Sequence, residues 1–161
     1  MNKTFLLIGG NLGERFLNLQ KTRELIGEKI GRIEAVSSIY ETAAWGVETQ
    51  PDFLNQALCV STELSPHELL AEIHLIEAIL ERKKLQKWGT RTMDIDILFF
   101  EKQIIEAPDL IIPHPYLHLR RFTLIPLCEL IPDFQHPVLK KSTLQLLLDC
   151  EDSLTVKKVI E

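Results

Sequence analysis

Short stretches of the chain alternate between apolar and polar residues or form brief apolar runs, which is typical of β-strands because their side chains point to opposite faces in turn. The clearest stretch ends at Phe100, where the alternation around Ile95 and Ile97 becomes a continuous apolar run. The other segments that this pattern predicts as strands are residues 4–8, 32–40, 52–62, 104–106 and 156–160.

Other stretches carry apolar residues three or four positions apart, which indicates helices with one buried face. The first covers residues 16–30 and should end at Gly31, since glycine readily adopts the conformation that ends a helix. The second should begin at Ser65, because Ser65 and Glu68 have the spacing of a capping box. Its predicted buried stripe consists of Leu69, Leu70, Ile73, Ile76 and Leu80. Further helical segments are predicted at 126–131 and 142–148.

The order of these elements predicts the fold class. Residues 101–103 are polar and separate two predicted strands, so a hairpin is expected there and this part of the sheet should be antiparallel. Strands mixed with two long helices favour an α+β fold, a two-layer sandwich in which helices cover a mostly antiparallel sheet. Nothing marks a boundary within residues 1–161, so we expect one domain.

Composition excludes several classes of function. The net charge of −5 argues against a broad nucleic-acid surface, which needs a basic face. No apolar run is long enough to span a bilayer, and the run at 5–8 is too short for a signal peptide, so we expect neither a membrane partner nor export. The three cysteines are far apart in apolar stretches, as expected of free thiols in a cytoplasmic protein.

Asp94 and Asp96 interrupt the apolar pattern of the strand that ends at Phe100. Residues two apart on a strand share a face, so both carboxylates should project together while Met93, Ile95 and Ile97 face a core. Two neighbouring anions repel one another, and a divalent cation such as Mg²⁺ would relieve that repulsion. The alternative is that the two aspartates lie at a solvated strand end, facing nearby lysines.

A basic run precedes the aspartates, comprising Arg82, Lys83, Lys84, Lys87 and Arg91. Metal-holding carboxylates beside cations suit the chemistry of polyphosphates, whose oxygens bridge metals while the cations neutralise developing charge. The protein as a whole is acidic, so this local basic run should serve a small anionic ligand.

Phe53 and Asn55 share a face of another predicted strand. An aromatic ring that stacks, beside an amide that both donates and accepts, suits a flat heterocycle. The alternative is a core phenylalanine with an asparagine that bonds to backbone. The loop at 9–13 also has two interpretations. It could bind phosphate, but it lacks a full phosphate-binding motif, so a tight turn that lets the backbone approach a neighbour is favoured.

Three further side chains are candidates for contacting a ligand. His74 and Glu77 lie three apart on one flank of the predicted helix, a spacing that by itself favours a solvated face. His114 lies between two prolines, which hold it in an extended conformation and aim its side chain in a definite direction.

Three motifs in this sequence resemble those of the 6-hydroxymethyl-7,8-dihydropterin pyrophosphokinase family of folate biosynthesis. The run W-G-T-R-T-M-D-I-D-I-L occupies residues 88–98, and P-H-P-x-x-x-x-R-x-F occupies 113–122. The third, T-x-x-x-G-x-x-x-Q-P-x-[FY]-x-N, occupies 42–55. Ala43, Ala44 and Thr90 differ from the residues most common in the family at those positions.

The resemblance implies a ferredoxin-like fold, and an enzyme that transfers pyrophosphate from ATP to 6-hydroxymethyl-7,8-dihydropterin and releases AMP. It further implies two Mg²⁺ ions as cofactors, held by Asp94 and Asp96, with Arg82 and Arg91 as the other catalytic residues. A monomer with ATP and a reduced pterin alcohol as its only partners is expected. The implied ATP-binding residues are His74, Glu77, Lys84, Trp88, Ile97, His114 and Arg120. The implied pterin-binding residues are Thr42, Ala43, Ala44, Trp45, Phe53, Asn55 and Phe122.

Two other functions are compatible with these residues. A D-x-D nucleotidyl- or glycosyltransferase would also need metal but would transfer a different fragment. A ferredoxin-like regulatory module would bind a ligand without catalysis. If the chain is a pyrophosphokinase, the cation-rich loop at 83–90 would act as a lid that ATP orders, and Trp88 would exclude water from the site.

Overall fold

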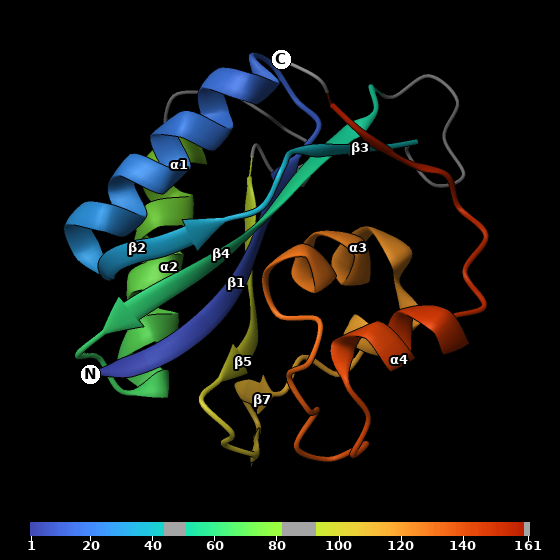
Figure 1. Cartoon of the computed structure of the whole chain (residues 1–161). Coiled ribbons are helices and arrows are strands. Elements are labelled where there is room, and N and C mark those ends of the chain that lie inside the picture. Colours follow the sequence, from blue (N-terminus) through green and yellow to red (C-terminus); the bar gives the residue numbers. More distant parts are fainter. Residues whose placement is uncertain (44–50, 82–92, 160–161) are drawn as a thin grey trace.

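A computed structural model describes residues 1–43, 51–81 and 93–159 of the chain. Its centre is a six-stranded sheet in which all pairings are antiparallel (Figure 1). The strands are β1 (Asn2–Gly10), β2 (Gly31–Val36), β3 (Tyr40–Thr42), β4 (Phe53–Thr62), β5 (Asp94–Phe100) and β8 (Val156–Lys158). Their order is β5-β1-β4-β3-β8, and β2 also pairs with β4.

Helices α1 (Arg15–Lys29) and α2 (Pro66–Glu81) cover one face of this sheet (Figure 1). With β1, β2, β4 and β5 they form the β-α-β-β-α-β order of a ferredoxin-like unit. The α+β class, the antiparallel sheet and the covering helices are therefore confirmed. The capping box at the start of α2 is confirmed too, because the amide of Glu68 donates to Ser65 Oγ at 3.2 Å and the amide of Ser65 donates to Glu68 Oε1 at 2.9 Å.

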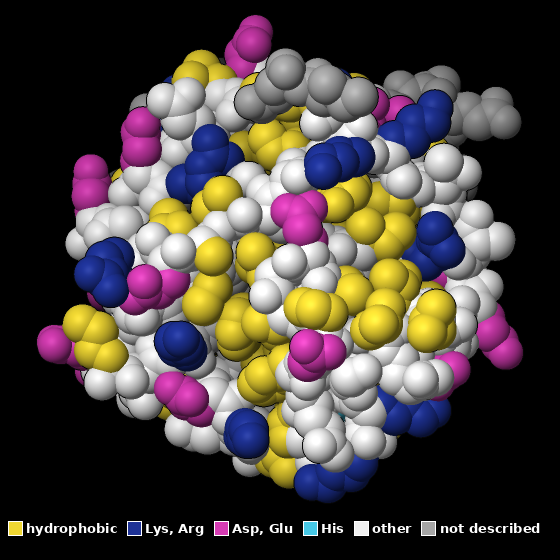
Figure 2. Space-filling view, in the orientation of Figure 1, with side chains coloured by type: hydrophobic (Ala, Val, Ile, Leu, Met, Phe, Trp, Pro, Cys, Tyr) yellow, Lys and Arg dark blue, Asp and Glu magenta, His cyan; other side chains and the backbone are white. Residues whose placement is uncertain are grey.

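The opposite face of the sheet is also covered, which adds a third layer to the predicted two. Helices α3 (Arg121–Leu130) and α4 (Thr143–Asp149) lie there, after a short 3-10 helix, η1 (Leu117–Leu119). Successive residues of β1 contribute to hydrophobic cores on opposite faces of the sheet. Leu6 and Ile8 pack toward α1 and α2, whereas Phe5 and Leu7 pack toward α3 and α4. Figure 2 shows the molecule in the orientation of Figure 1. On the surface that faces the viewer, apolar side chains gather in the middle and charged side chains lie mostly around them.

Two predicted elements differ in the structure. The single strand expected at 32–40 is two strands, β2 and β3, because the Ser37 hydroxyl accepts the amide of Ala57 at 2.9 Å where the ladder would continue. The strand expected at 104–106 does not pair with β5. It is β6 (Ile105–Ala107), which pairs with β7 (Leu110–Ile112) in a separate two-stranded sheet. One cause is that the amide of His114 donates to the carbonyl of Leu98 at 3.0 Å and so occupies that edge of β5.

None of the helices within the described residues is long and apolar enough to cross a membrane. The cysteines in the described part of the chain are free thiols, as predicted, although only Cys59 is fully buried while Cys128 and Cys150 are half-buried.

Candidate active site

A cavity of about 670 Å³ opens where β1 ends and β5 begins. Its walls come from β1, β3, β4, β5, η1, α3 and the segment that follows α4. Eight residues predicted from the sequence line it: Thr42, Ala43, Phe53, Asn55, Asp94, Asp96, Arg120 and Phe122. The fold therefore brings together three motifs that are far apart in the sequence.

The floor of this cavity is set by the register of three strands. Gly9 of β1 lies opposite Asn55 of β4 on one side and opposite Asp94 of β5 on the other. A Cβ atom at Gly9 would lie only 2.1 Å from Asn55 Oδ1, so the asparagine side chain occupies the space that a side chain at position 9 would need. The close backbone approach expected of the 9–13 segment is therefore present at Gly9, but Gly9 belongs to β1 and not to the predicted turn.

The two aspartates share a face of β5, as the pattern predicted. Both line the cavity, while Ile95 and Ile97 are 6% exposed on the other side and belong to the core beneath α1 and α2. Asp94 is exposed and Asp96 is half-buried, so both carboxylates can be reached from solvent.

A second, smaller cavity of about 210 Å³ meets the first at these aspartates. Asp94 and Asp96 line both, and the smaller one also contains His74, Glu77, Ile97 and His114. Glu77 is only 9% exposed, and its Oε2 accepts the amide of Ile95 at 3.1 Å. The solvated-face alternative is therefore wrong for Glu77, although His74 is exposed.

His114 projects into the smaller cavity in a defined protonation state. Its Nδ1 lies 3.1 Å from the amide of Tyr116 and accepts that hydrogen bond, so the ring proton is on Nε2. Burial, together with the nearby Arg120 guanidinium, lowers the pKa of His114 to about 4. The ring is neutral at pH 7 and offers one N–H donor.

Arg120 lies in the larger cavity, so the structure places His114 and Arg120, the two predicted ATP-binding residues of the motif at 113–122, on different cavities. Its guanidinium carbon is 5.2 Å from the centre of the Tyr116 ring and 5.6 Å from that of Phe122. These cation–π contacts hold the cation beside the aromatic wall. The sequence analysis did not identify Tyr116 as a partner of Arg120.

Thr42 and Phe53 form another wall, where β3 pairs with β4. The Thr42 hydroxyl oxygen is buried, and within the described residues it has no hydrogen-bond partner. Buried polar atoms are nearly always paired, so a ligand in the cavity is a suitable partner for this hydroxyl.

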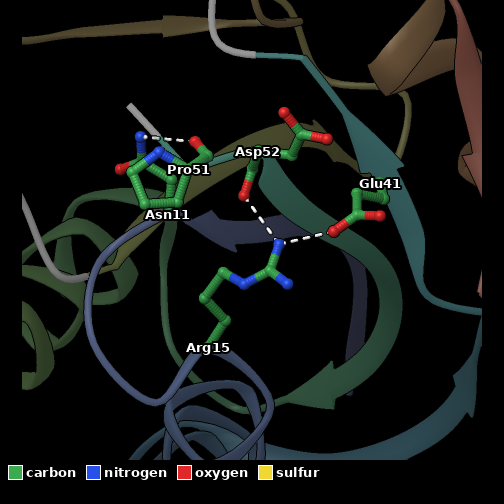
Figure 3. A network of polar contacts seen from close by, with 5 residues as sticks. All are labelled: Asn11, Arg15, Glu41, Pro51 and Asp52. Carbon is green, nitrogen blue, oxygen red and sulfur yellow. Dashed lines mark hydrogen bonds and ion pairs between the residues drawn. The ribbon is translucent and has the colours of Figure 1, made fainter. Parts of the chain in front are cut away.

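A polar network fixes the ends of β3 and β4 beside the cavity (Figure 3). Arg15 Nη1 donates to Glu41 Oε2 at 2.6 Å and to the carbonyl of Asp52 at 2.8 Å. Asn11 Nδ2 donates to the carbonyl of Pro51 at 3.2 Å. The arginine thus ties α1 to the strands that carry Thr42 and Phe53. No local pattern predicted this role of Arg15, because its partners are 26 and 37 positions away.

Some predicted site residues lie outside the described residues. These are Ala44, Trp45, Arg82, Lys84, Trp88 and Arg91, together with the proposed lid at 83–90. Conversely, Leu119, Asp152 and Leu154 line the larger cavity and were not predicted.

The two aspartates suit Mg²⁺, which is usually held by one or two carboxylates together with substrate phosphates and water. Within residues 1–43, 51–81 and 93–159, no group of three or more histidine, cysteine, aspartate or glutamate side chains could hold a metal by itself. A site of this kind would bind the metal together with a phosphate ligand.

The family model described as 7,8-dihydro-6-hydroxymethylpterin-pyrophosphokinase (HPPK) matches residues 5–132. The chain belongs to the HPPK family. It is 40% identical over 141 residues to the 2-amino-4-hydroxy-6-hydroxymethyldihydropteridine pyrophosphokinase of Aquifex aeolicus, covering 88% of both chains. It is 41% identical over 130 residues to the protein of the same name from Bacillus subtilis, covering 80% of this chain and 78% of that one.

The HPPK fold is also found in solved structures. The Plasmodium falciparum HPPK-DHPS wild-type structure matches with a TM-score of 0.73 at 18% identity, over 91% of this chain. This chain covers 44% of that one, so the similarity concerns one part of a longer protein. As an HPPK family member, the chain is an ATP-dependent transferase of folate biosynthesis, as the motifs predicted.

Two histidines of the HPPK chain, His114 and His136, have lowered pKa values, which leads to a prediction about stability. The ring of His136 is 5% exposed, and its Nδ1 accepts the amides of Val138 at 3.1 Å and Leu139 at 3.0 Å. Burial, with a contribution from His118, lowers the pKa of His136 to about 4, as for His114. Between the ordinary value of 6.5 and about 4 the unfolded chain binds more protons, so stability should fall as the pH falls.

We expect each histidine to contribute a slope of at most about 1.4 kcal/mol per pH unit in that window. Urea unfolding at pH 7.5, 6.0 and 5.0 measures it, using the wild type and His136→Gln. The variant should be less stable at pH 7.5 but should lose less stability on acidification. Equal losses in both proteins would contradict the assignment to His136.

Proposed function

We propose that this enzyme transfers pyrophosphate from ATP to 6-hydroxymethyl-7,8-dihydropterin, giving the pterin diphosphate and AMP. The observation that carries the proposal is the position of Asp94 and Asp96 at the junction of two cavities. One cavity offers aromatic and amide groups for a flat ring, and the other offers His74, Glu77 and His114 for a nucleotide. The names of the relatives from Aquifex aeolicus and Bacillus subtilis support the same substrate.

In this proposal the larger cavity binds the pterin. Phe53 and Phe122 line it from β4 and α3, and their rings would stack on the heterocycle. Asn55, whose side chain lies against Gly9, would form hydrogen bonds to the edge of the heterocycle. The Thr42 hydroxyl and the Ala43 backbone would form further hydrogen bonds to the same edge. Ala44 and Trp45 are assigned to this site from the sequence motif alone.

The smaller cavity would bind ATP, with its phosphates directed toward the aspartates. The Nε2–H of neutral His114 would donate to a phosphate oxygen or to the base, while His74 and Glu77 would contact the nucleoside. Ile97 contributes an apolar surface to the same cavity. Lys84, Trp88 and Arg120 are assigned to the nucleotide from the sequence motifs.

Asp94 and Asp96 would hold two Mg²⁺ ions, which would neutralise phosphate charge and lower the pKa of the attacking hydroxyl. The pterin hydroxyl loses its proton to solvent and its oxygen attacks the β-phosphorus in line; the bond from that phosphorus to the α-phosphate oxygen breaks, and AMP leaves with that oxygen. Arg82 and Arg91 would stabilise the charge that develops on the phosphates, so that catalysis is positional and electrostatic. We further propose a cytoplasmic monomer.

Product analysis tests this function directly. The protein, ATP, Mg²⁺ and 6-hydroxymethyl-7,8-dihydropterin are incubated together, and the nucleotide product is identified by chromatography. We expect AMP and the pterin diphosphate in equal amounts. Release of pyrophosphate or sugar transfer would instead indicate a nucleotidyl- or glycosyltransferase, and an absence of Mg²⁺-dependent turnover would favour a regulatory module.

A further inference from the structure

The segment from 150 to 159, which we call the C-terminal arm, passes along the larger cavity before its strand β8 pairs with β3. Asp152 and Leu154 line the cavity from this arm, and both are half-buried. β8 aligns Val156 with Thr42, so the arm is fixed next to the wall that carries the Thr42 hydroxyl. The arm is therefore part of the site's construction, although no motif pointed to it.

Helix α3 begins at the same cavity, and two residues at the start of this helix, Arg120 and Phe122, line the cavity. Arg120 is the N-cap, and Phe122 is the second helical residue. The Arg120 side chain makes no capping hydrogen bond, and the first turn contains no acidic residue. Exposed amides at a helix start need acceptors, so another part of the chain has to supply one.

Asp152 supplies that acceptor from 31 positions away. Its Oδ2 accepts the amide of Arg121, the first residue of α3, at 3.1 Å. Its Oδ1 accepts the amide of Leu154 at 3.0 Å, which holds the arm in the conformation that turns Leu154 toward the cavity. A carboxylate at this position also interacts favourably with the positive end of the helix dipole.

One side chain thus links two walls of the cavity, namely the start of α3 and the C-terminal arm. We propose that Asp152 is a positioning residue for pterin binding: it fixes the start of α3 so that Phe122 faces the pterin, and it keeps Leu154 in the cavity wall. This role rests on the proposed function. Asp152 acts through the residues it holds and takes no part in the transfer step.

Substitution of Asp152 by alanine tests the role. The variant loses both acceptors, so the first turn of α3 and the arm should separate from each other. We expect the Kd for the pterin, measured by fluorescence in the presence of a non-hydrolysable ATP analogue and Mg²⁺, to rise roughly tenfold, on the scale of a lost helix cap. The Kd for the analogue alone should change by less than about threefold, because Arg120 is the one residue assigned to ATP that lies at the start of α3.

Asp152→Asn retains one acceptor oxygen and asparagine is a good helix cap, so its pterin affinity should lie between those of the wild type and Asp152→Ala. The matched control is Asp149→Ala. Asp149 lies three positions earlier, and it bonds to Lys141 and Gln145 at 2.9 Å each rather than to α3. Its loss should leave the Kd for the pterin unchanged.

Circular dichroism establishes that each variant is folded before binding is compared. Equal pterin affinity in wild type and Asp152→Ala would overturn the positioning role, and so would an equal loss in Asp149→Ala. A wild-type protein that binds the ATP analogue but not the pterin would instead refute the proposed function, so the two failures are distinguishable.

Discussion

Alanine at Asp94 or at Asp96 is expected to reduce turnover by about 10³-fold or more, because a misplaced metal forfeits several kcal/mol of transition-state stabilisation. Both carboxylates project from one face of β5 into the junction of the two cavities. Each is exposed or half-buried, so its removal should cost little folding stability. The rate is measured at saturating ATP and pterin over a range of Mg²⁺ concentrations.

Asp109→Ala provides a control for the loss of an acidic side chain. Asp109 is exposed in the turn between β6 and β7, pairs with His67 at 3.3 Å, and is not among the residues that line either cavity. Its turnover should equal that of the wild type. Near-normal rates for both the Asp94 and the Asp96 variants would exclude the proposed two-metal site.

Loss of either aromatic ring from the proposed pterin site should weaken pterin binding and leave ATP binding almost unchanged. Phe53→Ala and Phe122→Ala should each cost about 1–3 kcal/mol of pterin binding, which is the scale measured for stacking of bases on aromatic side chains. Both rings are half-buried at the cavity rather than enclosed in the core. Titration calorimetry with pterin and with an ATP analogue, carried out separately, distinguishes the two ligands.

Phe134→Leu is the corresponding control. Phe134 packs against Phe99 with ring centres 4.7 Å apart and against Phe5 at 5.8 Å, in the core beneath α3 and α4. This variant should lose stability but keep its pterin affinity. If the Phe53 and Phe122 variants weakened both ligands equally, the two rings would be supports of the fold and not a stacking pair.

The parts of this molecule that could be predicted from sequence are those encoded by local patterns. Asp94 and Asp96 could be placed on one face of a strand because they interrupt a period of two in phase. The start of α2 could be predicted because Ser65 and Glu68 are only three residues apart and bond to each other. The aromatic and amide pair at Phe53 and Asn55 could be placed on one face for the same reason.

What could not be predicted depends on contacts between distant parts of the chain. β6 was assigned to β5 because the two are neighbours in sequence, whereas the edge of β5 is occupied by the amide of His114. The third layer is formed by α3 and α4, and no periodicity states which face of a sheet a helix will cover. Asp152 and Arg15 were missed because their partners are 26 to 37 residues away.

The central strand β1 has a practical consequence for immobilising the enzyme. It begins at Asn2 and reaches the larger cavity at Gly9, so these two positions are roughly 23 Å apart at the usual rise per residue. An affinity tag or a sensor-chip linkage at Met1, at the end marked N in Figure 1, would therefore be attached at the opposite end of β1 from the larger cavity. A linkage after Lys158 would instead be attached to β8, which pairs with the strand that carries Thr42, and would therefore lie closer to the larger cavity.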